Sequence, residues 1–184
     1  MRTILFSTLA VSVLAASGFA QSEVDQRKQS QQDRIANGVR SGQLTVKETQ
    51  HLEKKESNIN KEVGADRKAN GGNLTNNEKA KVNRQQNKVS GQIYDDKHNA
   101  KTATYGNNEV GARRQNQQDR IANGIQSGKM SAGQASKVEG KEVGINQQDA
   151  SDRRANGGNL TNNQKQSLNS QLNKTSSQIA KDKQ

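Results

Sequence analysis

The sequence predicts an all-α protein built from two tandem three-helix repeats, elongated and with a thin core. Three observations support this fold class. Most of the chain after residue 20 recurs at an offset of 86 residues. Four helix-start signals, two in each copy, divide each copy into three segments. The scarcity of large apolar side chains predicts the thin core and leaves partial disorder open as an alternative.

Residues 1–20 have the pattern of a secretory signal peptide. Arg2 supplies the positive charge, residues 3–16 form an apolar run, and Gly18-Phe19-Ala20 gives the small-x-small pattern of a cleavage site. The run is shorter than the ~20 apolar residues that a membrane-spanning helix needs. We therefore expect cleavage after Ala20 and a periplasmic or secreted protein.

The internal repeat is visible as two long strings that return with few changes. QQDRIANGVRSG returns as QQDRIANGIQSG, and DRKANGGNLTNNEK returns as DRRANGGNLTNNQK. One gap-free alignment covers both strings, and internal repeats of this kind usually form stacked units. We expect a first helical repeat, a polar linker and a second helical repeat at residues 21–98, 99–108 and 109–184.

A capping-box signal occurs four times, each preceded by a glycine, one spacer residue and an apolar residue. A Ser or Thr hydroxyl accepts from the third backbone amide of a helix, and a Glu or Gln side chain reaches back to the cap amide. The preceding glycine suits the left-handed end of the previous helix. The cap pairs are Thr45 with Glu48, Thr75 with Glu78, Ser131 with Gln134, and Thr161 with Gln164.

These signals predict three helices in each copy, and the apolar spacing agrees with them. Val82, Gln86, Val89 and Ile93 step by four, three and four residues, which is the period of one helix face. The short turns favour antiparallel neighbours. The expected helices cover residues 23–40, 45–69, 75–98, 109–126, 131–155 and 161–182.

Large apolar side chains are scarce after residue 20. Residues 21–184 contain 6 Leu, 7 Ile and 9 Val, so 22 of 164 residues, and no Phe, Trp or Cys. Ordering a residue costs about 1–2 kcal/mol, whereas burying a large aliphatic side chain returns about 1.5–3 kcal/mol. We therefore expect low stability, and a largely disordered stress-associated protein is a further alternative.

The sequence gives no sign of an enzyme. Metal sites and catalytic triads need several convergent ligands, and His51 and His98 are the only histidines, without motif partners. There is no nucleophile elbow, and no phosphate-binding loop is present. We predict no catalytic residue, no cofactor, no metal and no small-molecule substrate.

A degenerate EF-hand is the competing interpretation of the first turn. Residues 37–48 place Gly42 at the sixth position and Glu48 at the twelfth of the calcium-loop pattern. The acidic ligands of the first half are missing, and Gln134 and Gln164 replace the bidentate glutamate in the second copy. Capping alone explains the string, so we expect weak calcium binding or none.

The net charge of +11 suggests an anionic partner. Mixed signs, as in Glu53-Lys-Lys-Glu56, also fit helix faces that are simply solvated. Our leading hypothesis is binding of an unfolded protein or an anionic envelope component through basic helix faces. The residues expected to contribute charge are Lys54, Lys55, Lys61, Arg67, Lys79, Lys81 and Arg84.

Two resemblances add to this reading of the residues. The string Leu160-Thr161-Asn-Asn-Gln164 resembles the Leu-Thr-x-x-Gln motif of Spy-type periplasmic chaperones, which are exported, basic and all-helical. That resemblance implies a chaperone-like role. The longer pattern QQDRIANGVRSGQLT, followed by NRQQNKVSGQIYDDKH, resembles a group of uncharacterised exported bacterial helical-repeat proteins and implies no activity.

Overall fold

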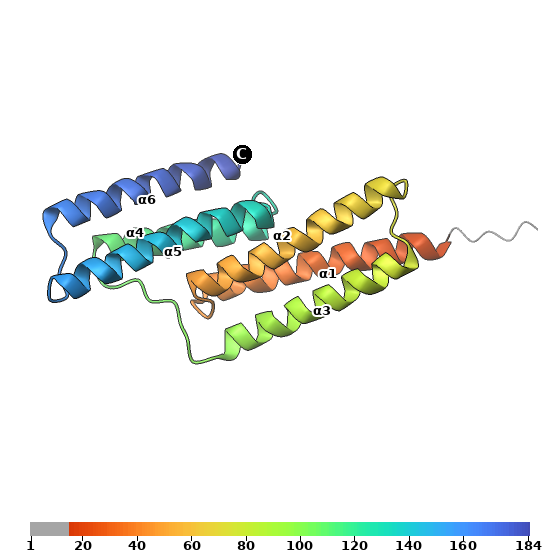
Figure 1. The fold of residues 1–184 in the computed structure, drawn as a ribbon, viewed down its shortest axis with the longest axis horizontal. Helices are drawn as coiled ribbons and strands as arrows, with labels where there is room; N and C mark the ends of the chain where they lie inside the picture. The colour runs from red at the N-terminus through yellow and green to blue at the C-terminus, as the bar shows by residue number, and fades with distance from the viewer. Residues whose placement is uncertain (1–14) are drawn as a thin grey trace, which may run out of the picture.

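The computed structural model describes residues 15–184, with side chains from Glu23 onward. Within that range the protein is all-helical, without a strand, and elongated (Figure 1). No described helix is both long and apolar enough to cross a membrane. The helices are α1 (Ala15–Arg40), α2 (Val46–Ala69), α3 (Asn76–His98), α4 (Glu109–Gln126), α5 (Ala132–Ala155) and α6 (Asn162–Asp182).

The six helices form two groups of three that lie end to end along the long axis (Figure 1). Helices α1, α2 and α3 pack on one another, as do α4, α5 and α6. The two groups meet through α2 with α5 and through α1 with α4. These two contacts are more extensive than any contact within either half, so α1, α2, α4 and α5 pack closely at the centre of the described molecule.

The same polar contacts hold the first helix of each half to the third. Gln31 Nε2 donates to the carbonyl of Gln86 at 2.7 Å, and Gln117 Nε2 donates to the carbonyl of Leu172 at 2.7 Å. The guanidinium groups of Arg34 and Arg120 donate to the carbonyls of Ser90 and Ser176, each at 3.0 Å. These pairs are 86 residues apart, so the sequence repeat is matched by repeated packing.

Nearly every large aliphatic side chain of the described chain is buried. From residue 23 onward, Val143 is the one Leu, Ile or Val that is not. The apolar stripe expected on α3 is buried in full, and its counterpart on α6 is Leu168, Leu172, Thr175 and Ile179. The core is thin because few apolar residues are available, and the fold uses almost all of them.

Capping boxes begin four of the helices. The Thr45 amide donates to Glu48 at 3.0 Å, and the Thr161 amide donates to Gln164 at 2.8 Å. Boxes of the same form start α3 and α5. The glycines that close the turns before α2 and α5, Gly42 and Gly128, have φ values of 71° and 69°, in the left-handed region that glycine tolerates best.

The caps should make a measurable contribution to stability. Replacing Thr75 or Thr161 with alanine removes the acceptor for the third amide of its helix, at an expected loss of about 0.5–2 kcal/mol. Urea unfolding followed by circular dichroism would measure the loss. Serine at either position keeps the hydroxyl and is the matched control, so an equal loss in the serine variants would contradict the capping role.

One helix start differs from the sequence prediction. Helix α1 begins at Ala15 rather than at residue 23, and no proline interrupts the segment. The predicted signal peptide, residues 1–20, lies mostly outside the described residues. Helix α4 has no capping box, and the Asn108 side chain accepts from the Gly111 amide at 3.1 Å instead.

The segment between α3 and α4 is ordered by contacts with both halves. The Ala103 amide donates to the carbonyl of Gly42 at 2.9 Å, next to the start of α2. The half-buried Tyr105 ring lies 5.3 Å from the guanidinium carbon of Arg114 on α4. Backbone carbonyls of Tyr105 and Gly106 lie directly against Gly111. The connection thus helps to fix the second half against the first.

Candidate functional site

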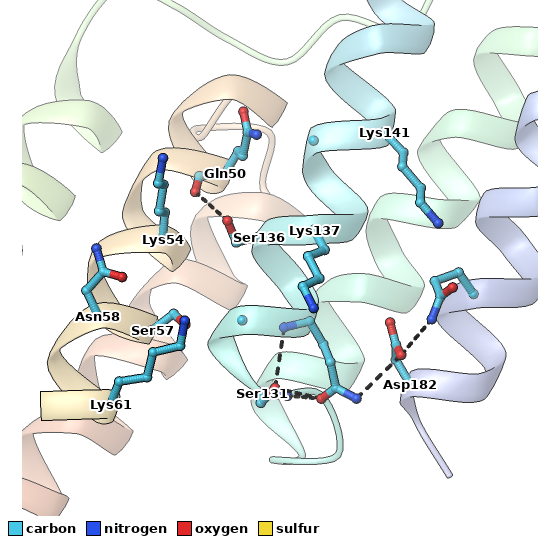
Figure 2. Close-up of a pocket in the computed structure, with 14 residues that line it drawn as sticks. Gln50, Lys54, Ser57, Asn58, Lys61, Ser131, Ser136, Lys137, Lys141 and Asp182 are labelled. Atoms are coloured by element: carbon cyan, nitrogen blue, oxygen red, sulfur yellow. Dashed lines mark hydrogen bonds between the residues drawn. The ribbon is translucent and has the colours of Figure 1, made fainter. Parts of the chain in front are cut away.

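A groove of about 820 Å³ lies where α2 and α5 meet. Figure 2 shows α2 forming one wall and α5 the other, with the end of α6 beside α5. Fourteen residues line it, almost all of them polar. A polar groove of this kind suits a charged or hydrogen-bonding partner better than an apolar one.

Small residues let the two helices approach closely at the floor of the groove. A Cβ added to Gly133 would lie 3.0 Å from Ser57 Oγ, and one added to Gly140 would lie 2.9 Å from Gln50 Nε2. Ser136 Oγ donates to the Gln50 carbonyl at 3.3 Å (Figure 2). The polar side chains above this contact are therefore held on a rigid base.

Four lysines dominate the charge of the groove. Lys54 and Lys61 come from α2, and Lys137 and Lys141 come from α5 (Figure 2). All four are exposed, and none forms an ion pair with an acidic residue in residues 23–184. Lys54 and Lys61 are two helical turns apart, about 10 Å along the axis. The groove therefore presents a row of positive charge.

Asp182 is the acidic residue on the lining, and it is already engaged. Gln178 Nε2 donates to Asp182 Oδ1 at 2.8 Å, and Gln134 Nε2 reaches the same oxygen at 3.4 Å. Both amides hold the carboxylate at the α6 end of the groove (Figure 2). Asp182 leaves the four lysine ammonium groups unpaired.

The structure brings together only part of the basic set expected from the sequence. Lys54 and Lys61 line the groove, whereas Lys55 donates to Gln92. The remaining four lie outside the groove lining. Arg67 pairs with Asp25 at 2.9 Å, Lys81 pairs with Glu62 at 2.8 Å, and Lys79 and Arg84 lie on α3.

Lys137 and Lys141 were missed at the sequence level. All of the basic residues predicted from the sequence lie in the first copy, whereas a groove between the copies contains residues from both. The repeat itself contained the signal, because Lys141 aligns with Lys55 at the same offset of 86 residues. The repeat alone does not predict every lysine of the groove, however, because Lys54 aligns with Gly140 in the second copy.

The structure corrects one expectation directly: Glu53 and Glu56 do not lie on a solvated face. Both are fully buried, with 0% of their surface exposed, and so are their counterparts Glu139 and Glu142. Helical period explains the burial, because Glu56 falls between Leu52 and Ile59 on the apolar stripe of α2. The sequence feature that could have predicted this burial is the Glu-x-x-Glu spacing, which occurs in both copies.

The buried glutamates have few polar partners. Gln32 Nε2 donates to Glu53 at 3.3 Å, and Gln118 Nε2 donates to Glu139 at 3.0 Å. One oxygen of each of these glutamates, and both oxygens of Glu56 and of Glu142, lack a hydrogen bond in the described chain. Burial of a charge without partners is costly, so these carboxyl groups favour the neutral form.

The pKa values follow from that burial. Desolvation raises the pKa of Glu53 to about 8 and the pKa of Glu56 and Glu142 to about 7, and it raises the pKa of Glu139 well above its usual range. Lys28 opposes the effect at Glu56, and Arg114 opposes it at Glu142. Near neutral pH much of this cluster therefore holds its protons.

The EF-hand-like turn is occupied by capping contacts. The Glu48 carboxylate accepts from the Thr45 amide and hydroxyl at 3.0 and 2.7 Å, and from Asn99 Nδ2 at 3.0 Å. Lys101 lies 3.7 Å from the same carboxylate. Over residues 15–184, no three His, Cys, Asp or Glu side chains are placed to hold a metal ion together.

The two histidines lie apart from the groove lining. His51 is exposed on α2, and His98 stacks on Tyr94 with ring centroids 4.2 Å apart at the end of α3.

Comparison of the chain with protein-family models, with curated proteins and with solved structures gives no match. Function must therefore be argued from the groove and the buried glutamates themselves.

Proposed function

We propose that this protein is a non-catalytic binding protein that holds a linear anionic partner in the groove between α2 and α5. The observation that carries the proposal is the set of four exposed lysines without ion-pair partners on two facing walls. An anionic polymer could contact both walls along its length. Such binding would need no cofactor and no rearrangement of the rigid floor.

Electrostatics favours a polymer over a small anion. The lysines are solvent-exposed, and each exposed charge pair is worth only about 0–1 kcal/mol. Several contacts made along one chain add up, and release of the polymer's counterions makes the binding strongly salt-dependent. Aromatic side chains that would stack on bases are absent from the groove lining, so base recognition is not part of the proposal.

The chaperone-like version of the hypothesis has less support from the surface. Clients that are unfolded expose apolar segments, and apolar patches on a surface are the usual sign of such partners. Tyr94, 59% exposed, is the one large apolar side chain exposed among residues 23–184. We therefore infer that charge, rather than apolar contact, selects the partner. Export to the periplasm or beyond stays a prediction from residues 1–20.

Binding of long-chain polyphosphate, a simple linear polyanion, tests the proposal. The variant K54Q/K61Q/K137Q/K141Q removes the groove charge, and fluorescence anisotropy would measure Kd at several salt concentrations. We expect about a 10- to 1000-fold weaker Kd at 50 mM salt. The slope of log K against log salt should shrink by about 0.7 for each lysine that contacts the polymer.

The matched control is K47Q/K68Q/K88Q/K174Q, which lowers the net charge equally at four exposed lysines outside the groove lining. This variant should bind almost as tightly as the unmodified protein. Equal losses in the two variants would show binding by net charge alone and would contradict a groove site. Absence of binding by the unmodified protein would contradict the proposal for this class of polymer.

A further inference from the structure

The four buried glutamates lie at the contact that joins the two halves of the molecule. Glu53 and Glu56 are on α2, and Glu139 and Glu142 are at the equivalent places on α5, the two helices that pack most extensively across the contact. Their sequence neighbours Leu52 and Val138 belong to one buried cluster, and the charge of Glu53 contributes to the raised pKa of Glu139, so both carboxyl groups lie at the contact between the halves. This arrangement does not depend on the proposed function of the groove.

The groups that face the cluster cannot neutralise it. Helix α1 contributes the Gln32 amide and the Lys28 ammonium, and helix α4 contributes the Gln118 amide and the Arg114 guanidinium. The Tyr105 hydroxyl, from the connection between the halves, is also nearby and uncharged, because desolvation raises its pKa. Two cations therefore face four acids.

The two cations are also unequal. Lys28 is exposed, so water screens its charge. Arg114 is 2% exposed, and its Nε and Nη2 atoms make no hydrogen bond in the described chain. Desolvation lowers the pKa of Arg114, while Glu142 and Asp149 oppose that shift. Full ionisation of the glutamates would leave at least two negative charges uncompensated in the interior, which is strongly unfavourable.

We propose that the contact between α2 and α5 is closed only while these glutamates are protonated, and that mildly alkaline pH separates the two halves. Loss of the protons places like charges on facing helices, and separation lets water reach the carboxylates. Separation exposes part of the apolar cluster that spans the contact, which includes Leu52 and Val138. The contacts of α3 with α1 and α2, and of α6 with α4 and α5, lie within one half each, so we expect the helices of each half to stay together. The groove, which both halves form, is lost when they part.

The sign of the pH dependence follows from the direction of the shifts. The cluster favours the closed form fully at pH values below the ordinary pKa of glutamic acid, near 4.5. Water-exposed carboxyl groups ionise above that value, so the advantage declines as pH rises and is lost as pH passes through the raised pKa values of the cluster, about 7 for Glu56 and Glu142 and about 8 for Glu53. Between pH 6 and pH 9 the fraction of open molecules should therefore increase.

Distance measurement between spin labels on the full chain tests the proposal. The chain has no cysteine, so N58C/G144C places one label on α2 and one on α5 at equivalent, exposed positions. We expect the distance distribution to move to longer values between pH 6 and pH 9. The pair N58C/K88C, on α2 and α3, should keep its distribution, since each half stays intact.

The decisive variant is E53Q/E56Q/E139Q/E142Q, made in the N58C/G144C background. Glutamine has the shape of the protonated side chain, so this variant should keep the short distance at pH 9. The matched control E23Q/E109Q, at equivalent exposed positions, should open like the unmodified chain. An unchanged distance at pH 9 in the unmodified chain, or opening of the fourfold glutamine variant, would overturn the proposal. A return to the short distance at pH 9 on addition of millimolar Ca²⁺ or Mn²⁺ at low salt would also overturn the proposal, because it would indicate that the glutamates form a cation site.

Discussion

Replacing Leu52 with alanine is expected to lower the free energy of unfolding by about 2–5 kcal/mol. Leu52 is 0% exposed and belongs to an apolar cluster that also contains Ile35 of α1, Ile121 of α4 and Val138 of α5. The substitution therefore opens a cavity in a core to which α1, α2, α4 and α5 all contribute. Urea unfolding of the full chain, followed by circular dichroism at 222 nm, would measure the loss.

The expected effect is large because the core contains few apolar side chains, so each one contributes a large share of the stability. A domain of ordinary stability unfolds at a free energy of about 5–15 kcal/mol, so this one change removes a substantial share. Tyr94→Ala is the control, because Tyr94 is 59% exposed and surface substitutions usually stay within about 0.5 kcal/mol. A loss below about 1 kcal/mol for Leu52→Ala would contradict the tight packing described between the halves.

Replacing Gly111 with alanine is expected to destabilise the protein by about 1–3 kcal/mol or more, because a rigid backbone contact must shift. A Cβ at this position would lie 2.0 Å from the Tyr105 carbonyl oxygen and 2.2 Å from the Gly106 carbonyl oxygen. Both neighbours are backbone atoms, so a rotamer change cannot relieve the clash. Thermal unfolding followed by circular dichroism would measure the fall in Tm.

The control for this prediction has the opposite sign. A Cβ at Gly64 of α2 or Gly144 of α5 meets no atom within 4 Å, so alanine there should stabilise the protein by about 0.5–1 kcal/mol. Helix propensity alone would predict stabilisation at all three positions. A rise in Tm for Gly111→Ala would therefore show that the connection does not press against the start of α4.

The helices could be predicted closely because their starts depend on local chemistry. A hydroxyl three residues before a Glu or Gln needs no tertiary contact to begin a helix, so Thr75 and Thr161 mark helix starts in the sequence itself. Periodicity placed Val82 and Ile93 on one buried face for the same reason. Helix α4 was also placed correctly at 109–126, although its Asn108 cap has no capping box.

The candidate site could be predicted only in part because it depends on contacts between distant segments. Lys54 and Lys61 were chosen for their charge, but the facing wall comes from α5, and nothing local says which helices meet. Composition was misleading for Glu53 and Glu56, since adjacent lysines favour a solvated interpretation of such a string. These glutamates have the same helical spacing as the apolar residues of the buried face, and this spacing occurs in both copies. The spacing therefore predicts their burial better than their charge does.

The buried carboxyl groups also change how much charge the folded molecule carries in solution. The formal value of +11 counts every glutamate as ionised. Proton retention by Glu53, Glu56, Glu139 and Glu142 makes the native state up to four units more positive at the same pH, as much as +15. The denatured chain releases those protons. Native molecules should therefore elute later from a cation-exchange column than their composition implies, and unfolding should release protons and acidify a weakly buffered solution.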